Sequence, residues 1–284
     1  MSIDNNTFPP QNVYPIDVTS GAEFARLIDQ SKLMHLALKS LLPEDVNLFP
    51  GMVVLDLACG PGGWTTELAF QHRDITVIGV DCDKEVVKYA QALARVQQLE
   101  NVAFEVMDIR QPLDFEENTI DLIHGRFLAG VLNKATWPKL LSECKRVLKP
   151  SGVIVLTECE GVSTNSPALH QLQAYLFHAL YQQQRTFSLD GYSLGIAYML
   201  RKLLEDAGFL NLTIHPFVID MTADTVLYHY ALKDMEFLYM LVKPYIVNLG
   251  LVDSATYDQI YDQMIRETYQ LSFVGMCFGL TVWG

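Results

Sequence analysis

A glycine-rich turn that follows an apolar run constrains the fold of this chain more than any other feature. Residues 53–57 are almost all aliphatic, which is typical of a strand covered on both faces. Glycines follow at Gly60, Gly62 and Gly63, and residues 65–70 then read as the start of a helix. Glycine adopts main-chain angles that other residues avoid, and the first amides of a helix offer unpaired donors to an anionic group. The segment predicts an α/β fold with a ligand at this turn, although an ordinary strand-to-helix turn could carry the same glycines.

A second apolar strand ends in an acidic residue. Residues 75–81 are mostly aliphatic and finish at Asp81, about twenty residues beyond the turn, where a carboxylate can accept hydrogen bonds from a ribose. Two kinds of nucleoside-binding protein share this plan. A dinucleotide fingerprint requires glycine or alanine at its last position, which is Thr65 when the count starts at Gly60. Because an acid, Asp56, also precedes the turn, the dinucleotide pattern fits poorly.

The pattern Asp56-x-x-x-Gly60-x-Gly62-Gly63 resembles the first motif of class I S-adenosylmethionine-dependent methyltransferases. Trp64 stands where many members carry another glycine. The resemblance implies S-adenosylmethionine as the cofactor, with Asp56 ordering the turn, two glycines near the methionine end, and the acid of the second strand holding the ribose. It places these residues of the two segments at the cofactor: Asp56, Ala58, Gly60, Pro61, Gly62, Trp64, Asp81 and Cys82.

Two further strand ends belong to the same resemblance. Residues 102–108 read as the third strand, and Asp108 with Ile109 resembles the position where a carboxylate accepts from the adenine amino group beside an apolar wall. An acid that merely starts the following loop is the alternative. After the fourth predicted strand come Arg126 and Phe127, and the family would direct Arg126 or its main chain toward the methionine portion of the cofactor.

The N-terminal region resembles the lid of a subgroup of small-molecule methyltransferases, in which a helix lies over the cofactor. The resemblance rests on Glu23-x-x-Arg26 and Gln30 in a helix expected over residues 22–42, preceded by Tyr14. It implies that Tyr14, Arg26 and Gln30 contact the cofactor or the acceptor. The alternative is a solvated helix face with an intrahelical Glu–Arg pair.

Composition and charge limit the possible partners. Half of the 284 residues are hydrophobic, and the formal net charge is -13. Nucleic-acid binders usually cluster Lys and Arg against phosphates, so we expect no nucleic acid and a small-molecule acceptor. The cysteines are odd in number and lack a Cys-x-x-Cys pair, so neither a disulfide framework nor a zinc site or other metal is indicated. With no secretory signal and no apolar run near the ~20 residues that cross a bilayer, we expect no membrane span and a cytoplasmic protein, whose apolar composition permits a homodimer.

The expected fold class is α/β, a doubly wound seven-stranded sheet whose order, 3-2-1-4-5-7-6 with the last strand antiparallel, follows from the resemblance. Helices are expected over residues 168–181 and 197–207, and the sixth and seventh strands over 209–217 and 273–283. The predicted organisation is an arm and lid helix (1–42), a cofactor-binding core (43–160 and 197–221), two helical cap inserts (161–196 and 222–271) and a final core strand (272–284).

The inserts and several titratable residues bear on the reaction. Both inserts are rich in aromatic residues and are expected to form an apolar chamber, which suits a hydrophobic acceptor such as a secondary metabolite, quinone, phenol or isoprenoid-like compound. Aromatic residues at helical spacing can equally be core packing. Methyl transfer needs positioning, exclusion of water and loss of a proton. The candidates for the base are His124, Glu158, Glu160, His170 and His178.

Three functions stay open at the level of the sequence. The first is methyl transfer to an oxygen, nitrogen or carbon atom of a small acceptor. The second is a methyltransferase-fold protein that binds the cofactor but acts as a cyclase, isomerase or regulator, because fold does not fix function. The third is a nicotinamide-dependent oxidoreductase or a nucleotide-binding module, which is weakened by Thr65 and by the lack of a Tyr-x-x-x-Lys pair after a strand of the sheet.

Overall fold

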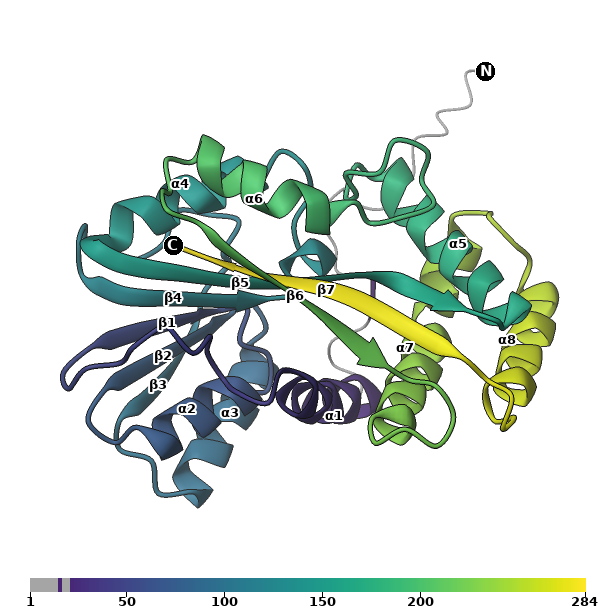
Figure 1. The fold of residues 1–284 in the computed structure, drawn as a ribbon, viewed down its shortest axis with the longest axis horizontal. Helices are drawn as coiled ribbons and strands as arrows, with labels where there is room; N and C mark the ends of the chain where they lie inside the picture. Colours follow the sequence, from purple (N-terminus) through teal and green to yellow (C-terminus); the bar gives the residue numbers. More distant parts are fainter. Residues whose placement is uncertain (1–14, 17–20) are drawn as a thin grey trace, which may run out of the picture.

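The centre of the molecule is a seven-stranded sheet, seen in the computed structural model that describes residues 15–16 and 21–284 (Figure 1). The strands are β1 (Val53–Leu57), β2 (Thr76–Asp81), β3 (Val102–Val106), β4 (Ile120–Arg126), β5 (Leu148–Thr164), β6 (Thr213–Asp220) and β7 (Gly275–Trp283). Their order is β3-β2-β1-β4-β5-β7-β6. Only the pairings of β7, with β5 and β6, are antiparallel within this sheet. The predicted fold class and strand order are confirmed.

Helices cover both faces of the sheet and extend past one end of it. The helices are α1 (Gly21–Leu38), α2 (Gly63–Gln71), α3 (Lys84–Val96), α4 (Trp137–Val147), α5 (Pro167–Gln182), α6 (Ile196–Asp206), α7 (Tyr228–Asn248) and α8 (Ser254–Thr268), with a short 3₁₀ turn, η1 (Leu128–Gly130). Figure 1 shows α1, α2 and α3 on one face and α4 and α6 on the other, while α5, α7 and α8 gather beyond the carboxyl ends of the central strands. Within the described part of the chain, no helix combines the length and apolarity needed to cross a bilayer.

The turn between β1 and α2 depends on its glycines. Gly62 is the N-cap of α2 and has φ +81°, a left-handed conformation that L side chains rarely adopt. A Cβ on Gly62 would lie 2.7 Å from the ring of Phe104 on β3. The turn can therefore lie against the sheet only without a side chain at this position, and that packing brings the first amides of α2 to the carboxyl edge of the sheet.

Several boundaries differ from the sequence prediction. Helix α1 ends at Leu38 instead of residue 42, and β5 runs for 17 residues, past Glu158, because β7 pairs with it as far as Thr164. Strand β6 begins at Thr213 instead of residue 209. Phe209 is buried in the core beside α6, and Asn211 has φ 55°, so the chain turns before it becomes extended.

Candidate active site

A cavity of ≈ 390 Å³ lies at the carboxyl edge of the sheet, under α1 and the cap helices. Ligands bind at this edge in open α/β sheets. The cavity borders most of the predicted cofactor residues: Arg26, Gln30, Asp56, Ala58, Gly60, Pro61, Trp64, Asp81, Cys82, Asp108, Ile109, Arg126 and Phe127. Gly62 does not border it and instead shapes the turn behind it. Tyr14 lies outside the described residues.

The carboxylate of Asp81 is already oriented by two main-chain donors. Its Oδ2 atom accepts from the amide of Gly60 at 3.0 Å, and its Oδ1 atom accepts from the amide of Asp83 at 3.0 Å. Burial raises the pKa of Asp81, and these two hydrogen bonds oppose that effect. Each carboxylate oxygen keeps a further lone pair. The side chain can therefore accept hydrogen bonds from two vicinal hydroxyls, as the ribose of a nucleoside requires.

Asp56 is held from behind by residues of α2 and β4. Its Oδ2 atom accepts from the Thr65 hydroxyl at 2.5 Å, and its Oδ1 atom lies 2.7 Å from Nδ1 of His124. The His124 ring stacks flat on Trp64, with ring centroids 3.5 Å apart and planes 5° apart. Burial lowers the pKa of His124, so the ring is neutral near pH 7 and its Nδ1–H donates to Asp56. His124 thus fixes the orientation of a carboxylate that borders the cavity.

Asp108 makes a paired contact that the sequence did not suggest. Its two oxygens accept from Nε and Nη2 of Arg110 at 2.8 and 2.9 Å. The Arg110 guanidinium lowers the pKa of Asp108, which keeps the carboxylate ionised. Ile109 is buried beside it and borders the cavity. The Oδ1 atom of Asp108 also accepts from the main-chain amide of Arg110 at 3.0 Å, so Oδ2 is the oxygen that can accept from a ligand at this end of the cavity.

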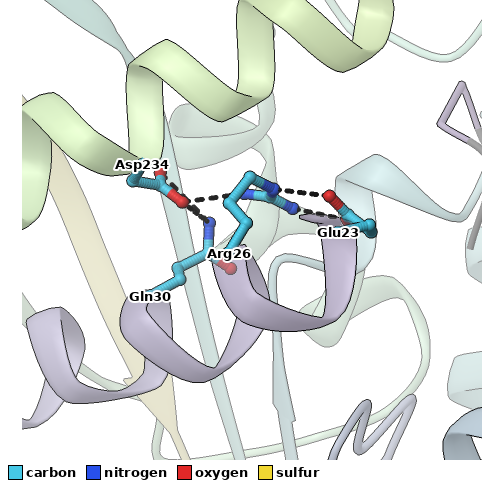
Figure 2. A network of polar contacts seen from close by, with 4 residues as sticks. All are labelled: Glu23, Arg26, Gln30 and Asp234. Carbon is cyan, nitrogen blue, oxygen red and sulfur yellow. Dashed lines mark hydrogen bonds and ion pairs between the residues drawn. The ribbon is translucent and has the colours of Figure 1, made fainter. Parts of the chain in front are cut away.

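A buried polar network joins α1 to α7 above the cavity (Figure 2). Arg26 donates to both oxygens of Glu23, at 2.7 and 2.8 Å, and to Oδ1 of Asp234 at 2.9 Å. The Gln30 amide reaches the Asp234 carboxylate at 3.4 Å. The predicted cofactor contacts Arg26 and Gln30 therefore border the cavity while bound to protein carboxylates. Asp234 lies 208 residues from Arg26 along the chain, and nothing in the sequence indicated this partnership.

A family model described as a methyltransferase domain matches residues 48–206, the part of the chain that contains the glycine turn and the acidic strand ends. The chain belongs to the class I S-adenosylmethionine-dependent methyltransferases. Its cofactor is S-adenosylmethionine, and the residues at the cavity fit it, since Asp81 offers two oriented acceptors and the turn has room for a ligand at Gly60.

Two curated relatives and one solved structure illustrate the range of this family. The chain is 30% identical to phosphoethanolamine N-methyltransferase 3 of Arabidopsis thaliana over 58% of its own length, and 26% identical to a demethylmenaquinone methyltransferase of Staphylococcus aureus over 64%, covering 78% of that protein. A Haemonchus contortus phosphoethanolamine N-methyltransferase 2 structure matches 96% of the chain and 61% of that chain, with a TM-score of 0.53 and 18% identity, a likeness of fold. The chain spans half or less of the length of two curated relatives, 30% in the case of the plant protein.

Among the candidate bases, Glu158 has an environment that suits a group that takes up and releases a proton. It borders the cavity and is 1% exposed, and its Oε1 atom accepts from the amide of Ala129 at 3.2 Å. Burial raises the pKa of Glu158 to about 8. Glu160 also borders the cavity, but its carboxylate accepts from the amides of Leu194, Gly195 and Ala197 and so caps the start of α6.

The three histidine candidates do not border the cavity. His124 lies behind Asp56, His170 is exposed on α5, and His178 packs near Tyr181 with ring centroids 6.3 Å apart. The structure therefore argues against all three as bases, because none reaches the space where an acceptor could lie. Residues 15–16 and 21–284 also contain no cluster of three or more His, Cys, Asp or Glu side chains that could hold a metal ion.

The cap closes the cavity with aliphatic side chains more than with aromatic ones. Helix α5 contributes Leu176, Phe177 and Leu180, and helix α7 contributes Met235, Leu238, Tyr239 and Val242. Of the tyrosines in the described cap inserts, only Tyr239 borders the cavity. Tyr257 on α8 instead donates to the Tyr239 carbonyl at 2.6 Å inside the cap core. The lining that α5 and α7 give to the cavity is mainly apolar, and Tyr261 on α8, like Tyr257, donates to a main-chain carbonyl of α7.

Proposed function

We propose that the chain transfers the methyl group of S-adenosylmethionine to a small, largely apolar acceptor held under α5 and α7. The observation that carries the proposal is the continuity of one cavity from the glycine turn to the aliphatic wall of the cap. A ligand pocket lined mostly by apolar groups, with a few placed polar groups, selects an acceptor of matching character.

The cofactor would be divided among three groups of residues. Asp81 would hold the ribose, and Asp108 with Ile109 would hold the adenine. Asp56 and Arg126 carry opposite charges at the same part of the cavity, which suits the ammonium and carboxylate of the methionine portion. Once bound, the cofactor supplies an electrophilic methyl group on a sulfonium. The chain itself positions the acceptor and excludes water, which are the main demands of such a displacement.

Glu158 would accept the proton that the acceptor loses. With a pKa of about 8, it exchanges a proton with a hydroxyl or amine near neutral pH, where an exposed glutamate would be a far weaker base. Its position on β5, between the turn and the cap, supports this role because both parts of the cavity adjoin it. The acceptor would then carry one ionisable group at Glu158 and an apolar body under α7.

Charge at the cavity favours a quinol- or phenol-like acceptor over a phosphate ester. The cationic side chains that border the cavity, among the described residues, are Arg26 and Arg126. Arg26 already binds Glu23 and Asp234, so a phosphate ester would compete with buried carboxylates for its donors. The relative named demethylmenaquinone methyltransferase therefore offers a closer guide to the acceptor than the phosphoethanolamine enzymes do.

The test is a calorimetric titration followed by a transfer assay. We expect binding of S-adenosylmethionine and S-adenosylhomocysteine but not of NADH, and transfer of a labelled methyl group to a reduced naphthoquinone or a naphthol but not to phosphoethanolamine. An Asp81→Ala variant should bind the cofactor about 1–3 kcal/mol more weakly while keeping its melting temperature. Cofactor binding with transfer only to phosphoethanolamine would contradict the acceptor class, and absence of cofactor binding would contradict the placement at Asp81.

A further inference from the structure

The side chain of Tyr239 on α7 brings an unpartnered hydroxyl to the wall of the cofactor cavity. The residue borders the cavity and is 3% exposed. Its main-chain carbonyl accepts from Tyr257, but its phenol hydroxyl makes no hydrogen bond with any described residue. Buried tyrosine hydroxyls usually have a hydrogen-bond partner, because removal from water without one costs free energy. A hydroxyl without a protein partner at a ligand cavity therefore calls for a partner on the ligand.

Three other tyrosines of the cap show the usual arrangement. The hydroxyls of Tyr228, Tyr257 and Tyr261 each donate to a main-chain carbonyl, and none of the three residues borders the cavity. The Tyr239 hydroxyl is also not one of the fully enclosed polar atoms that lack a partner in the described part of the chain, so it keeps accessible surface. Because Tyr239 is almost wholly buried and borders the cavity, that surface faces the cavity.

The cap helices α5 and α7 bring three polar side chains to the cavity, and two of them are already bound by the protein. These side chains are Gln173, Asp234 and Tyr239. Gln173 bonds the main-chain amide and carbonyl of Val162, at 2.6 and 3.2 Å. Asp234 accepts from two side chains of α1 (Figure 2). Tyr239 is therefore the polar side chain of these two helices that is free to bind an acceptor within an otherwise apolar wall.

The surroundings of Tyr239 determine which chemical group it can bind. Burial raises the pKa of Tyr239, and nearby charges act in the same direction, so the phenol keeps its proton at neutral pH and can donate it. A buried anion at this wall would need a cation, but Arg26 is already bound by Glu23 and Asp234. The group that Tyr239 suits is therefore an uncharged oxygen, such as a hydroxyl.

We propose that Tyr239 selects a methyl acceptor with two oxygens, an aromatic diol whose second hydroxyl accepts a hydrogen bond from the Tyr239 phenol. This inference rests on the proposed function, because it takes the first hydroxyl to lie at Glu158 and the ring to lie under α5 and α7. Glu158 lies on β5 and Tyr239 on α7, two different walls of one cavity. A flat diol with its oxygens at opposite ends presents one to each wall. A phenol with one hydroxyl leaves the Tyr239 hydroxyl or Glu158 without a partner on the ligand.

The experiment compares two ligands that differ by one hydroxyl, 1,4-dihydroxynaphthalene and 1-naphthol. Each is titrated without oxygen into the full chain saturated with S-adenosylhomocysteine, and binding is measured by calorimetry. We expect the unaltered chain to bind the diol about fivefold to tenfold more tightly than the naphthol. Tyr239→Phe keeps the ring and removes only the hydroxyl, so it should lose this preference while its affinity for 1-naphthol stays within about twofold. A structural role of the hydroxyl would instead weaken both ligands equally.

A matched control and a transfer assay separate the possible failures. Tyr261→Phe removes a cap hydroxyl that does not border the cavity, so this variant should keep the preference for the diol. Preference for the diol in binding, without methyl transfer to either compound, would contradict the proposed function and still support Tyr239 as the residue that binds the second oxygen. Absence of binding of both compounds, equal affinity of the unaltered chain for the two, or an unchanged preference in a folded Tyr239→Phe variant would overturn the inference.

Discussion

At the scale of single residues, the site shows which roles a sequence motif can assign. Asp56, Gly60 and Asp81 follow one another at spacings that a short motif records, and all three border one cavity. His124 sits in an equally suggestive position after the fourth strand. Its role depends on contacts with Asp56 and Trp64, which only the folded chain brings together. The sequence therefore suggested His124 as a candidate base, whereas in the structure the ring orients the Asp56 carboxylate.

Replacement of Glu158 by glutamine should have opposite effects on activity and stability. The activity of the unaltered enzyme should rise with pH through about 8, because the base must be ionised, and E158Q should lose about 100-fold in rate. The folded-state pKa lies above the ordinary value of 4.5, so folding is penalised progressively as pH rises from 4.5 to about 8. E158Q should therefore exceed the unaltered chain in free energy of unfolding by more than about 1 kcal/mol at pH 8, but not at pH 4. Denaturant titrations at the two pH values test this, and an E158Q variant with full activity would exclude Glu158 as the base.

Loss of the hydrogen bond from His124 to Asp56 should lower the affinity only for ligands that have a methionine portion. His124→Leu removes the donor to Asp56, whereas His124→Asn can place an amide N–H where Nδ1–H was. We expect His124→Leu to bind S-adenosylhomocysteine about 5- to 10-fold more weakly and His124→Asn to recover part of the loss. Methylthioadenosine, which lacks the amino acid, should bind both variants equally. Equal weakening for both ligands would indicate a general packing defect instead.

At the scale of elements, α1 and α7 together cover the cavity, and the contacts between these two helices keep them in place. The sequence predicted α1 from its helical periodicity and suggested that it covers the cofactor. Periodicity within one segment does not show, however, which helix of a cap insert that segment packs against. That pairing follows from Arg26 and Asp234, which are 4% and 15% exposed and 2.9 Å apart. The polar face of α1 is consequently only partly solvated, because Glu23 and Arg26 are buried.

Removal of the Asp234 carboxylate should loosen this junction. Asp234→Ala leaves buried Arg26 with Glu23 alone, and we expect a loss of about 1–3 kcal/mol in the free energy of unfolding and faster amide hydrogen exchange along α1. Lys233→Gln is the matched control, because Lys233 joins the same two helices through an exposed bond to Asp29. That pair should contribute less than about 1 kcal/mol. If both variants lose the same stability, the buried network does not hold the helices together.

At the scale of the whole molecule, the resemblance predicted the order of the strands in the sheet, but it did not predict where each element begins and ends. The core helices and strands follow one another along the chain as they do in the family. Their arrangement in space could therefore be predicted once the family motif was recognised. The long β5 and the path of the chain after α1 depend on contacts between distant segments, whereas β6 starts late because of the turn at Asn211. Trp64 shows one such contact, since its Nε1 donates to the Leu41 carbonyl at 2.9 Å and fixes the chain after α1 has ended.

Adding a side chain at Gly279 should destabilise the half of the sheet that consists of β5, β7 and β6. A Cβ there would lie 2.3 Å from the Phe217 ring, which covers the glycine from the paired strand. We expect Gly279→Ala to displace this ring and cost about 1–3 kcal/mol in the free energy of unfolding, measured by urea titration. Gly21→Ala is the control, because nothing lies within 4 Å of a Cβ there and alanine favours a helix. Equal stability of the two variants would mean that Phe217 moves aside freely.

The insertion of β7 between β5 and β6 also bears on the order in which the chain can fold during synthesis. β5 and β6 do not pair with each other, and the strand that joins them, β7, is made by the ribosome after both; β5 pairs with β4 as well, but β6 pairs with β7 alone in this sheet. The five parallel strands and their helices can form while translation continues, but β6 and the wall of the cavity at Cys277 must wait for residues 275–283. During that interval the apolar residues of β6 and the cap are without their main partner, so this is the stage at which a chaperone would be most useful.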